Sequence, residues 1–158
     1  MKAVINLIKS FGYAFKGLLL CVKKCRNFRI HMVAAVTVIY FSRYFDLTPN
    51  SYAVLFLTFA LVLCAEAFNC AIEYVCDDIT TQYSENIKKA KDTAAGAVLV
   101  CALFSVFIAI TLFFKPAVLI DIFNSFYSSP VKLILLLVYI TICAIFIFYE
   151  DILKYGKK

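Results

Sequence analysis

YAVLFLTFALVLCAEAFNCAIEYVC, residues 52–76, is the stretch that decides the fold. A helix needs about 20 mainly apolar residues to cross the hydrocarbon core of a bilayer, and this run is long enough to do so. It nevertheless carries Glu66, Asn69 and Glu73 among its apolar residues. Ionisable groups at membrane depth are costly, so they face protein or water and usually mark a functional site.

These polar residues share one face of the predicted helix. Each residue turns the helix by about 100°, so positions 66, 69, 73 and 77 fall within about 80° of one another. Glu66, Asn69, Glu73 and Asp77 should therefore form a row that runs from mid-membrane to the water boundary. A polar hairpin, residues 77–92, follows and ends in KKAKD. Carboxylates, an amide and a nearby Lys-Asp pair are suited to a metal ion and phosphates.

Composition indicates an all-α integral membrane protein. The 158 residues are 64% hydrophobic and 16% charged, with a mean hydropathy of +0.90. Soluble domains are about half apolar and about a quarter charged. The net charge of +6 comes from bases that flank apolar runs, which is the membrane pattern rather than a nucleic-acid-binding one. The seven cysteines mostly lie in apolar runs, and we interpret them as small buried hydrophobes rather than a disulfide framework.

The apolar pattern predicts an N-terminal helix and four spans. Residues 1–25 repeat apolar side chains every three or four positions, with lysines mostly elsewhere, which is typical of an amphipathic helix lying in the membrane interface. The predicted spans are residues 30–47, 52–76, 93–114 and 131–149. Cys21 and Cys25 are one helical turn apart and could bind a metal, although packing is the simpler interpretation.

The distribution of bases predicts the orientation. The N-terminal segment has seven Lys and Arg residues, the 77–92 hairpin three and the C-terminal tail three. By the positive-inside rule, both termini and the hairpin are expected in the cytoplasm, where ATP is found. His31 should then lie near the cytoplasmic boundary, level with Glu73, either merely solvated or in contact with metal or phosphate.

Phosphoryl transfer needs a bridging metal, positive charge on the phosphates and a base beside the acceptor hydroxyl. The chain has neither G-x-x-x-x-G-K-[ST] nor G-x-G-x-x-G. Even so, Glu73 could hold Mg²⁺, Lys91 could neutralise phosphate, and Glu66 could accept a proton from a lipid hydroxyl. The same carboxylates would also suit a proton or ion pathway without enzymatic activity.

The run EAFNCAIEYVCD, followed by IKKAKDTAAGAV, closely resembles the signature of the prokaryotic diacylglycerol kinases, small integral-membrane lipid kinases that include undecaprenol kinases. The segments GYAFKG and NFRIHMVAAV resemble the N-terminal helix and first span of that family. The resemblance implies a kinase domain over residues 1–114, with residues 115–158 as an extension that carries a fourth span. It also implies a homotrimer in the bacterial plasma membrane, with ATP as co-substrate and Mg²⁺ as cofactor.

The resemblance further implies roles for single residues. Glu66 would be the catalytic base and Glu73 a Mg²⁺ ligand, while His31 stands where related diacylglycerol kinases carry a second metal-binding Glu. The residues expected to contact ATP or its phosphates are Tyr13, Asn69, Tyr83, Lys91 and Asp92. The Arg29-Ile30-His31 sequence favours undecaprenol as the lipid, with diacylglycerol as the alternative. A catalytically inactive relative, whose polar face only joins subunits, is a further alternative.

Overall fold

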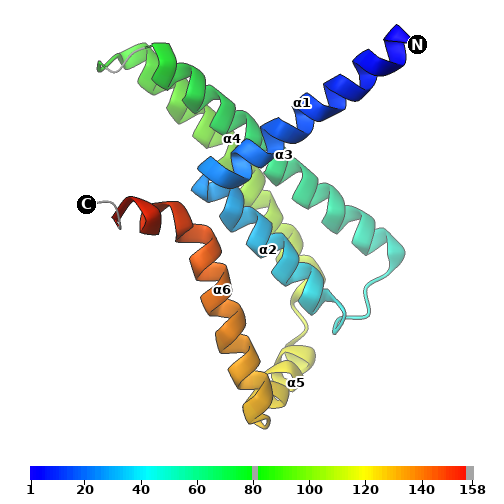
Figure 1. The fold of residues 1–158 in the computed structure, drawn as a ribbon. Helices are drawn as coiled ribbons and strands as arrows, with labels where there is room; N and C mark the ends of the chain where they lie inside the picture. The colour runs from blue at the N-terminus through cyan, green and yellow to red at the C-terminus, as the bar shows by residue number, and fades with distance from the viewer. Residues whose placement is uncertain (80–81, 156–158) are drawn as a thin grey trace.

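The fold is all-α, as the sequence predicts. The computed structural model describes residues 1–79 and 82–155. Over these ranges it is 90% helical and contains six helices (Figure 1). The helices are α1 (Lys2–Lys24), α2 (Arg26–Ser42), α3 (Pro49–Ile79), α4 (Glu85–Phe113), α5 (Pro116–Tyr127) and α6 (Pro130–Tyr155). By length and composition, α1, α3, α4 and the Pro130–Glu150 part of α6 could each cross a membrane.

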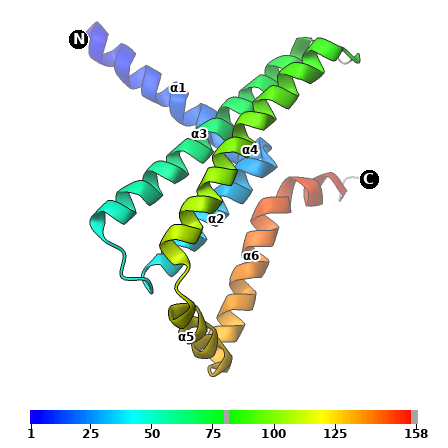
Figure 2. The same cartoon turned by 180° about the vertical axis from the view of Figure 1, so that it is seen from behind.

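The centre of the molecule is an antiparallel pair formed by α3 and α4. Figures 1 and 2 show the end of α3 beside the start of α4, and the two helices diverge toward their other ends. Small residues at the start of α4 allow the backbones to approach closely, and Ala94 and Val98 are buried there. The buried residues of α3 recur every three or four positions and form one stripe: Leu55, Thr58, Val62, Glu66 and Asn69. The polar residues therefore continue the packed face of α3 rather than facing lipid.

The first two helices differ in part from the sequence prediction. Figure 1 shows α1 crossing the α3–α4 pair rather than running beside it, and none of its residues is buried. This arrangement suits an interfacial helix, although α1 is also long and apolar enough to span. The span predicted at residues 30–47 corresponds to α2, which begins at Arg26 and ends at Ser42. With 17 residues α2 is about 25 Å long, slightly shorter than a typical hydrocarbon core.

The C-terminal helices return along α2. Pro116 and Pro130 each occupy the start of a helix, where a missing N–H group costs nothing. The hydroxyls of Thr37 on α2 and Tyr139 on α6 lie 2.6 Å apart and share a hydrogen bond. At the other end of α2, the ring of Phe41 packs against that of Phe126 on α5. Helices α5 and α6 are therefore docked on α2.

Arg29 ties three helices together at the junction of α1 and α2. Its side chain is 1% exposed. The guanidinium donates to the carbonyls of Val22 and Lys23 at the end of α1, at 3.1 and 2.9 Å. It also donates twice to the carbonyl of Ile147 on α6, at 3.0 and 2.8 Å, and lies over the ring of Tyr149. The planar fork of arginine suits this task, because it serves several acceptors at once.

We expect Arg29→Met to destabilise the protein strongly, because it leaves buried carbonyls without donors at a cost of about 1–3 kcal/mol for each unsatisfied group. Thermal unfolding of the purified protein in detergent measures the effect. Arg43→Met is the matched control, since Arg43 is exposed and lies over the rings of Tyr40 and Tyr44. Equal losses in the two variants would show that the Arg29 contacts do not hold the junction.

Candidate functional site

The buried stripe of α3 becomes polar at Glu66 and Asn69. Glu66 is 2% exposed and Asn69 is 4% exposed. The amide of Asn69 donates to a carboxylate oxygen of Glu73, at 3.1 Å. Within the described part of the chain, Glu66 Oε2 and Asn69 Oδ1 are buried without a hydrogen-bond partner. Buried polar atoms are nearly always paired, so two unpaired oxygens on neighbouring turns indicate a place for a ligand.

These residues line a cavity of about 360 Å³, which we call the site cavity. One wall is α3, and the other is the junction of α1 and α2. The lining residues are Lys24, Cys25, Arg26, Asn27, Glu66, Cys70, Glu73, Tyr74 and Asp77. Three carboxylates therefore face two bases across one cavity, an arrangement that can hold a cation and phosphates together.

A second cavity, which we call the hairpin cavity, adjoins the first at Asp77. Its volume is about 630 Å³, and it lies between the ends of α3 and α4. Lys91 forms an ion pair with Asp77 there, and Asp92 and Tyr83 are also among the lining residues. Small-molecule sites usually occupy about 300–1,000 Å³, so both cavities have a suitable size. The predicted nucleotide residues of the hairpin thus lie on the same side of the molecule as Glu73.

Two predicted site residues lie elsewhere in the chain. Tyr13 is 67% exposed on α1, with the ammonium of Lys16 6.0 Å from its ring centre. His31 lines a separate, mainly apolar cavity between α2, α3 and α4, together with Val62 and Leu63. In the part of the chain that the structure describes, His31 and Glu73 line different cavities. A shared role of the two residues therefore stays a prediction.

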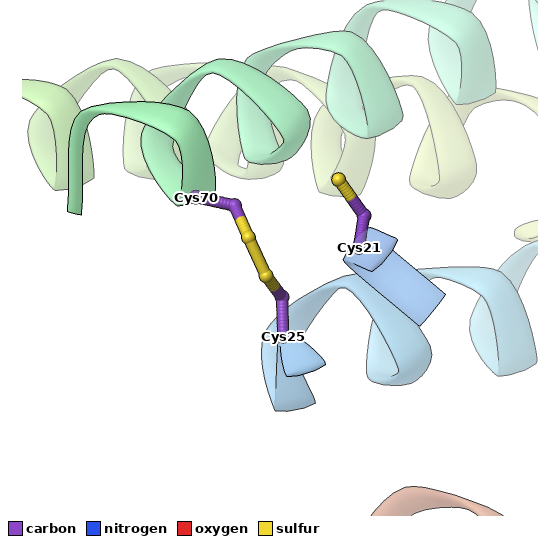
Figure 3. Close-up of side chains that lie close together, drawn as sticks. All are labelled: Cys21, Cys25 and Cys70. Atoms are coloured by element: carbon purple, nitrogen blue, oxygen red, sulfur yellow. A yellow bond between two sulfur atoms is a disulfide. The ribbon is translucent and has the colours of Figure 1, made fainter. Parts of the chain in front are cut away.

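The junction of α1 and α2 contributes side chains to the site. Lys24, at the end of the predicted interfacial helix, lines the site cavity and pairs with Glu150 of α6 at 2.8 Å. The packing role given to the cysteines is also incomplete. Cys25, at the junction, forms a disulfide with Cys70 of α3, and their Cα atoms lie 6.4 Å apart (Figure 3).

The donor atoms of the site cavity fit a hard cation. Carboxylate and amide oxygens are the ligands that Mg²⁺ prefers, and Glu66, Asn69 and Glu73 supply them from consecutive turns of α3. The unpaired Asn69 Oδ1 is available for this purpose. The sulfur atoms of Cys25 and Cys70, which also line the cavity, are soft and do not suit this ion.

The chain matches the family model described as prokaryotic diacylglycerol kinase over residues 12–113. This region includes most of α1 and all of α2, α3 and α4. It contains the site cavity and the hairpin cavity with all their lining residues.

Curated relatives carry two different names. A diacylglycerol kinase of Synechocystis is 41% identical over 112 residues, which cover 70% of this chain and 64% of that protein. The undecaprenol kinase of Bacillus subtilis is 35% identical over 108 residues, covering 68% of this chain and 88% of the relative. A diacylglycerol kinase of Escherichia coli is 32% identical over 101 residues, covering 64% and 83%. This chain thus spans somewhat less than two thirds of the Synechocystis relative.

We expect Glu66→Leu to stabilise the protein by about 1–3 kcal/mol, because it removes a buried oxygen that has no partner. The shift of the thermal unfolding midpoint in detergent measures this. Val62→Ala, one turn away on the same buried stripe, should instead lower the midpoint by leaving a cavity. If Glu66→Leu lowered the midpoint as much as Val62→Ala, Glu66 would be a satisfied packing residue.

Proposed function

Because the chain belongs to the prokaryotic diacylglycerol kinase family, we propose that it transfers the terminal phosphoryl group of ATP to the hydroxyl of a membrane lipid. The observation that carries this proposal is the buried, unpartnered Glu66 carboxylate in a cavity that it shares with Glu73, Asp77 and two bases. A proton pathway or an inactive homologue would not need the adjoining cavity with Lys91 and Asp92.

Glu66 is the catalytic base of the proposed reaction. Its free oxygen accepts the proton as the O–H bond of the lipid breaks, and the lipid oxygen then forms the new bond to phosphorus while the bond to ADP breaks. The position suits a lipid substrate, because the apolar part of the α3 stripe begins one turn deeper, at Val62. A long apolar chain can remain in the bilayer while its hydroxyl reaches Glu66.

Glu73 and Asn69 are the proposed Mg²⁺ ligands. In phosphoryl transfer, this ion bridges the phosphates and neutralises their developing charge. The hydrogen bond from the Asn69 amide orients the Glu73 carboxylate, and Asn69 Oδ1 is left without a partner. His31 is also a proposed ligand. Since it faces another cavity of its own chain, this role depends on a neighbouring subunit.

The nucleotide is proposed to lie over the hairpin cavity. Lys91 would leave Asp77 and neutralise phosphate charge, and Asp92 and Tyr83 would contact the rest of the nucleotide. Tyr13 extends from α1 with two thirds of its side chain exposed, so it is free to cover a nucleotide. The bases near this end support a cytoplasmic hairpin and cytoplasmic termini in the plasma membrane of a bacterium.

A homotrimer would complete this site and cover apolar surface. Large apolar side chains of α4 such as Leu103, Phe104 and Phe107 are more than 60% exposed. Lipid accounts for much of this exposure, and neighbouring subunits would account for the rest. We propose that residues 1–114 form the kinase domain. Residues 115–158 would support it through the docking of α6 on α2.

Undecaprenol is our first candidate for the lipid, and diacylglycerol is the second. The sequence Arg29-Ile30-His31 favours undecaprenol through the family resemblance. Within the described residues, the hydrogen bonds that Arg29 donates all go to backbone carbonyls. His31 is therefore the part of this sequence that is free to influence the choice. The names of the Synechocystis and Escherichia coli relatives keep diacylglycerol in consideration.

Purified protein in mixed micelles with Mg-ATP should phosphorylate a lipid alcohol. The transfer of labelled phosphate from ATP to the lipid measures this activity. Glu66→Gln should reduce turnover by about 10²–10⁴-fold, the usual contribution of a general base, with nucleotide binding largely kept. Glu73→Ala should raise the Mg²⁺ requirement or abolish turnover. Near-normal turnover in Glu66→Gln would contradict the proposed role.

Two matched controls test the supporting role of the C-terminal segment. Lys132→Ala removes an exposed hydrogen bond to Ser125 Oγ at 2.5 Å. Glu150→Ala removes the ion pair with Lys24, in which the Lys24 side chain is 53% exposed and the Glu150 side chain 17%. A single hydrogen bond or an ion pair at the surface contributes about 0–1.5 kcal/mol, so both variants should keep near-normal turnover. A large loss in either would place α6 in the active site.

A direct competition between undecaprenol and diacylglycerol in the same micelles tests the choice of lipid. We expect the larger kcat/KM for undecaprenol, and we expect His31→Glu to shift the ratio toward diacylglycerol. A higher kcat/KM for diacylglycerol with the unchanged chain would reverse our assignment while leaving the kinase activity intact.

A further inference from the structure

Three cysteines from two distant parts of the sequence meet beside the site cavity. Cys21 lies in the last turns of α1, Cys25 at the junction of α1 and α2, and Cys70 on α3. Their sulfur atoms all lie within 4.8 Å of one another. Figure 3 shows the three side chains converging from the two helices. Cys70 is 2% exposed, and Cys21 and Cys25 are half-buried.

This grouping is more than a pair of bonded cysteines. A disulfide between Cys25 and Cys70 uses two sulfurs and leaves Cys21 as a third thiol at the same point. Disulfides are rare in the reducing cytoplasm, where a cluster of cysteines more often binds a metal. The junction faces that compartment in the orientation that the bases indicate.

We propose that the reduced Cys21, Cys25 and Cys70 thiolates bind one thiophilic divalent cation of the Zn²⁺ type. A zinc–sulfur bond of about 2.3 Å requires sulfurs about 3.8 Å apart around a tetrahedral ion, which the cluster reaches with small side-chain movements. Three protein ligands leave the fourth position for water. Three thiolates and one divalent cation together carry a net negative charge. Lys24 and Arg26, which line the adjoining cavity, lie close enough to offset this charge.

The donor atoms separate this site from the proposed Mg²⁺ site. Sulfur selects soft or borderline ions, whereas the oxygens of Glu73 and Asn69 select hard ones. The metal itself deprotonates the thiols that bind it. Because α1 has no buried residue of its own, the ion would act as a link that holds α1 against α3. The proposal does not depend on the kinase assignment.

Cobalt titration of the full chain tests the site without ATP or lipid. The protein is purified in detergent, reduced with a phosphine that contains no thiol, and titrated with Co²⁺. We expect one Co²⁺ per chain, with the sulfur-to-cobalt charge-transfer absorption and tetrahedral visible bands of thiolate ligation, and displacement by Zn²⁺. The chain oxidised to its Cys25–Cys70 disulfide should lose this absorption, because two ligands are no longer available.

Matched cysteine variants assign the ligands. Cys70→Ser should weaken binding roughly tenfold or more, and the triple Cys21, Cys25 and Cys70 variant should abolish the thiolate absorption. The matched control replaces Cys64, Cys76, Cys101 and Cys143 by Ala, which leaves the cluster intact and should leave the titration unchanged. Helical circular dichroism of each variant shows that it folds.

Three results would overturn the proposal. The first is no thiolate absorption from the reduced chain, and the second is equal absorption from the triple variant. The third is cobalt bound only through oxygen, without charge-transfer absorption. Failure of kinase activity would leave the titration unaffected, so the two proposals can fail separately.

Discussion

The buried stripe of α3 is the constraint on which the rest of the structure depends. The stripe is apolar through Leu55 and Val62 and becomes polar at Glu66 and Asn69 without leaving the packed face. Burying these groups is unfavourable unless protein, ion or substrate satisfies them. The junction of α1 and α2 lies opposite this segment and supplies the bases of the site cavity. Burying Glu66 and Asn69 therefore lowers the stability of the fold, and their unpaired oxygens remain free to bind an ion or a substrate.

The junction itself is held from the far end of the chain. Arg29 connects the end of α1 to the Ile147 carbonyl of α6, and the hydroxyl of Tyr149 donates to the Lys23 carbonyl at 2.7 Å. These contacts are mostly hydrogen bonds to backbone carbonyls. They fix the position of the end of α1 relative to α6 and involve no acidic side chain. The C-terminal segment lies outside the residues that match the family, yet it supports the wall that faces Glu66. The helix pair α3–α4 and this junction together determine where the two cavities meet.

Local patterns predicted much of this arrangement. Helical periodicity placed Glu66, Asn69 and Glu73 on one face, and the structure shows Glu66, Glu73 and Asp77 lining one cavity. The predicted start of the last span near residue 131 agrees with the start of α6 at Pro130. Periodicity alone could not predict which cavity His31 lines, because that depends on how α2, α3 and α4 pack together. Nor could it predict the disulfide between Cys25 and Cys70, which are 45 residues apart. The hydrogen bonds from Arg29 to the Ile147 carbonyl of α6 were equally outside its reach. These are contacts between distant segments, and local sequence carries little information about them.

The reactivity of Glu66 tests the central claim most directly. A hydrophobic carbodiimide reacts with a protonated carboxyl group in an apolar setting, and mass spectrometry of the labelled protein identifies the site. The account predicts a single main adduct at Glu66, formed in proportion to the loss of phosphoryl transfer and slowed by Mg-ATP with lipid. Complete labelling of Glu66 with activity retained would contradict it.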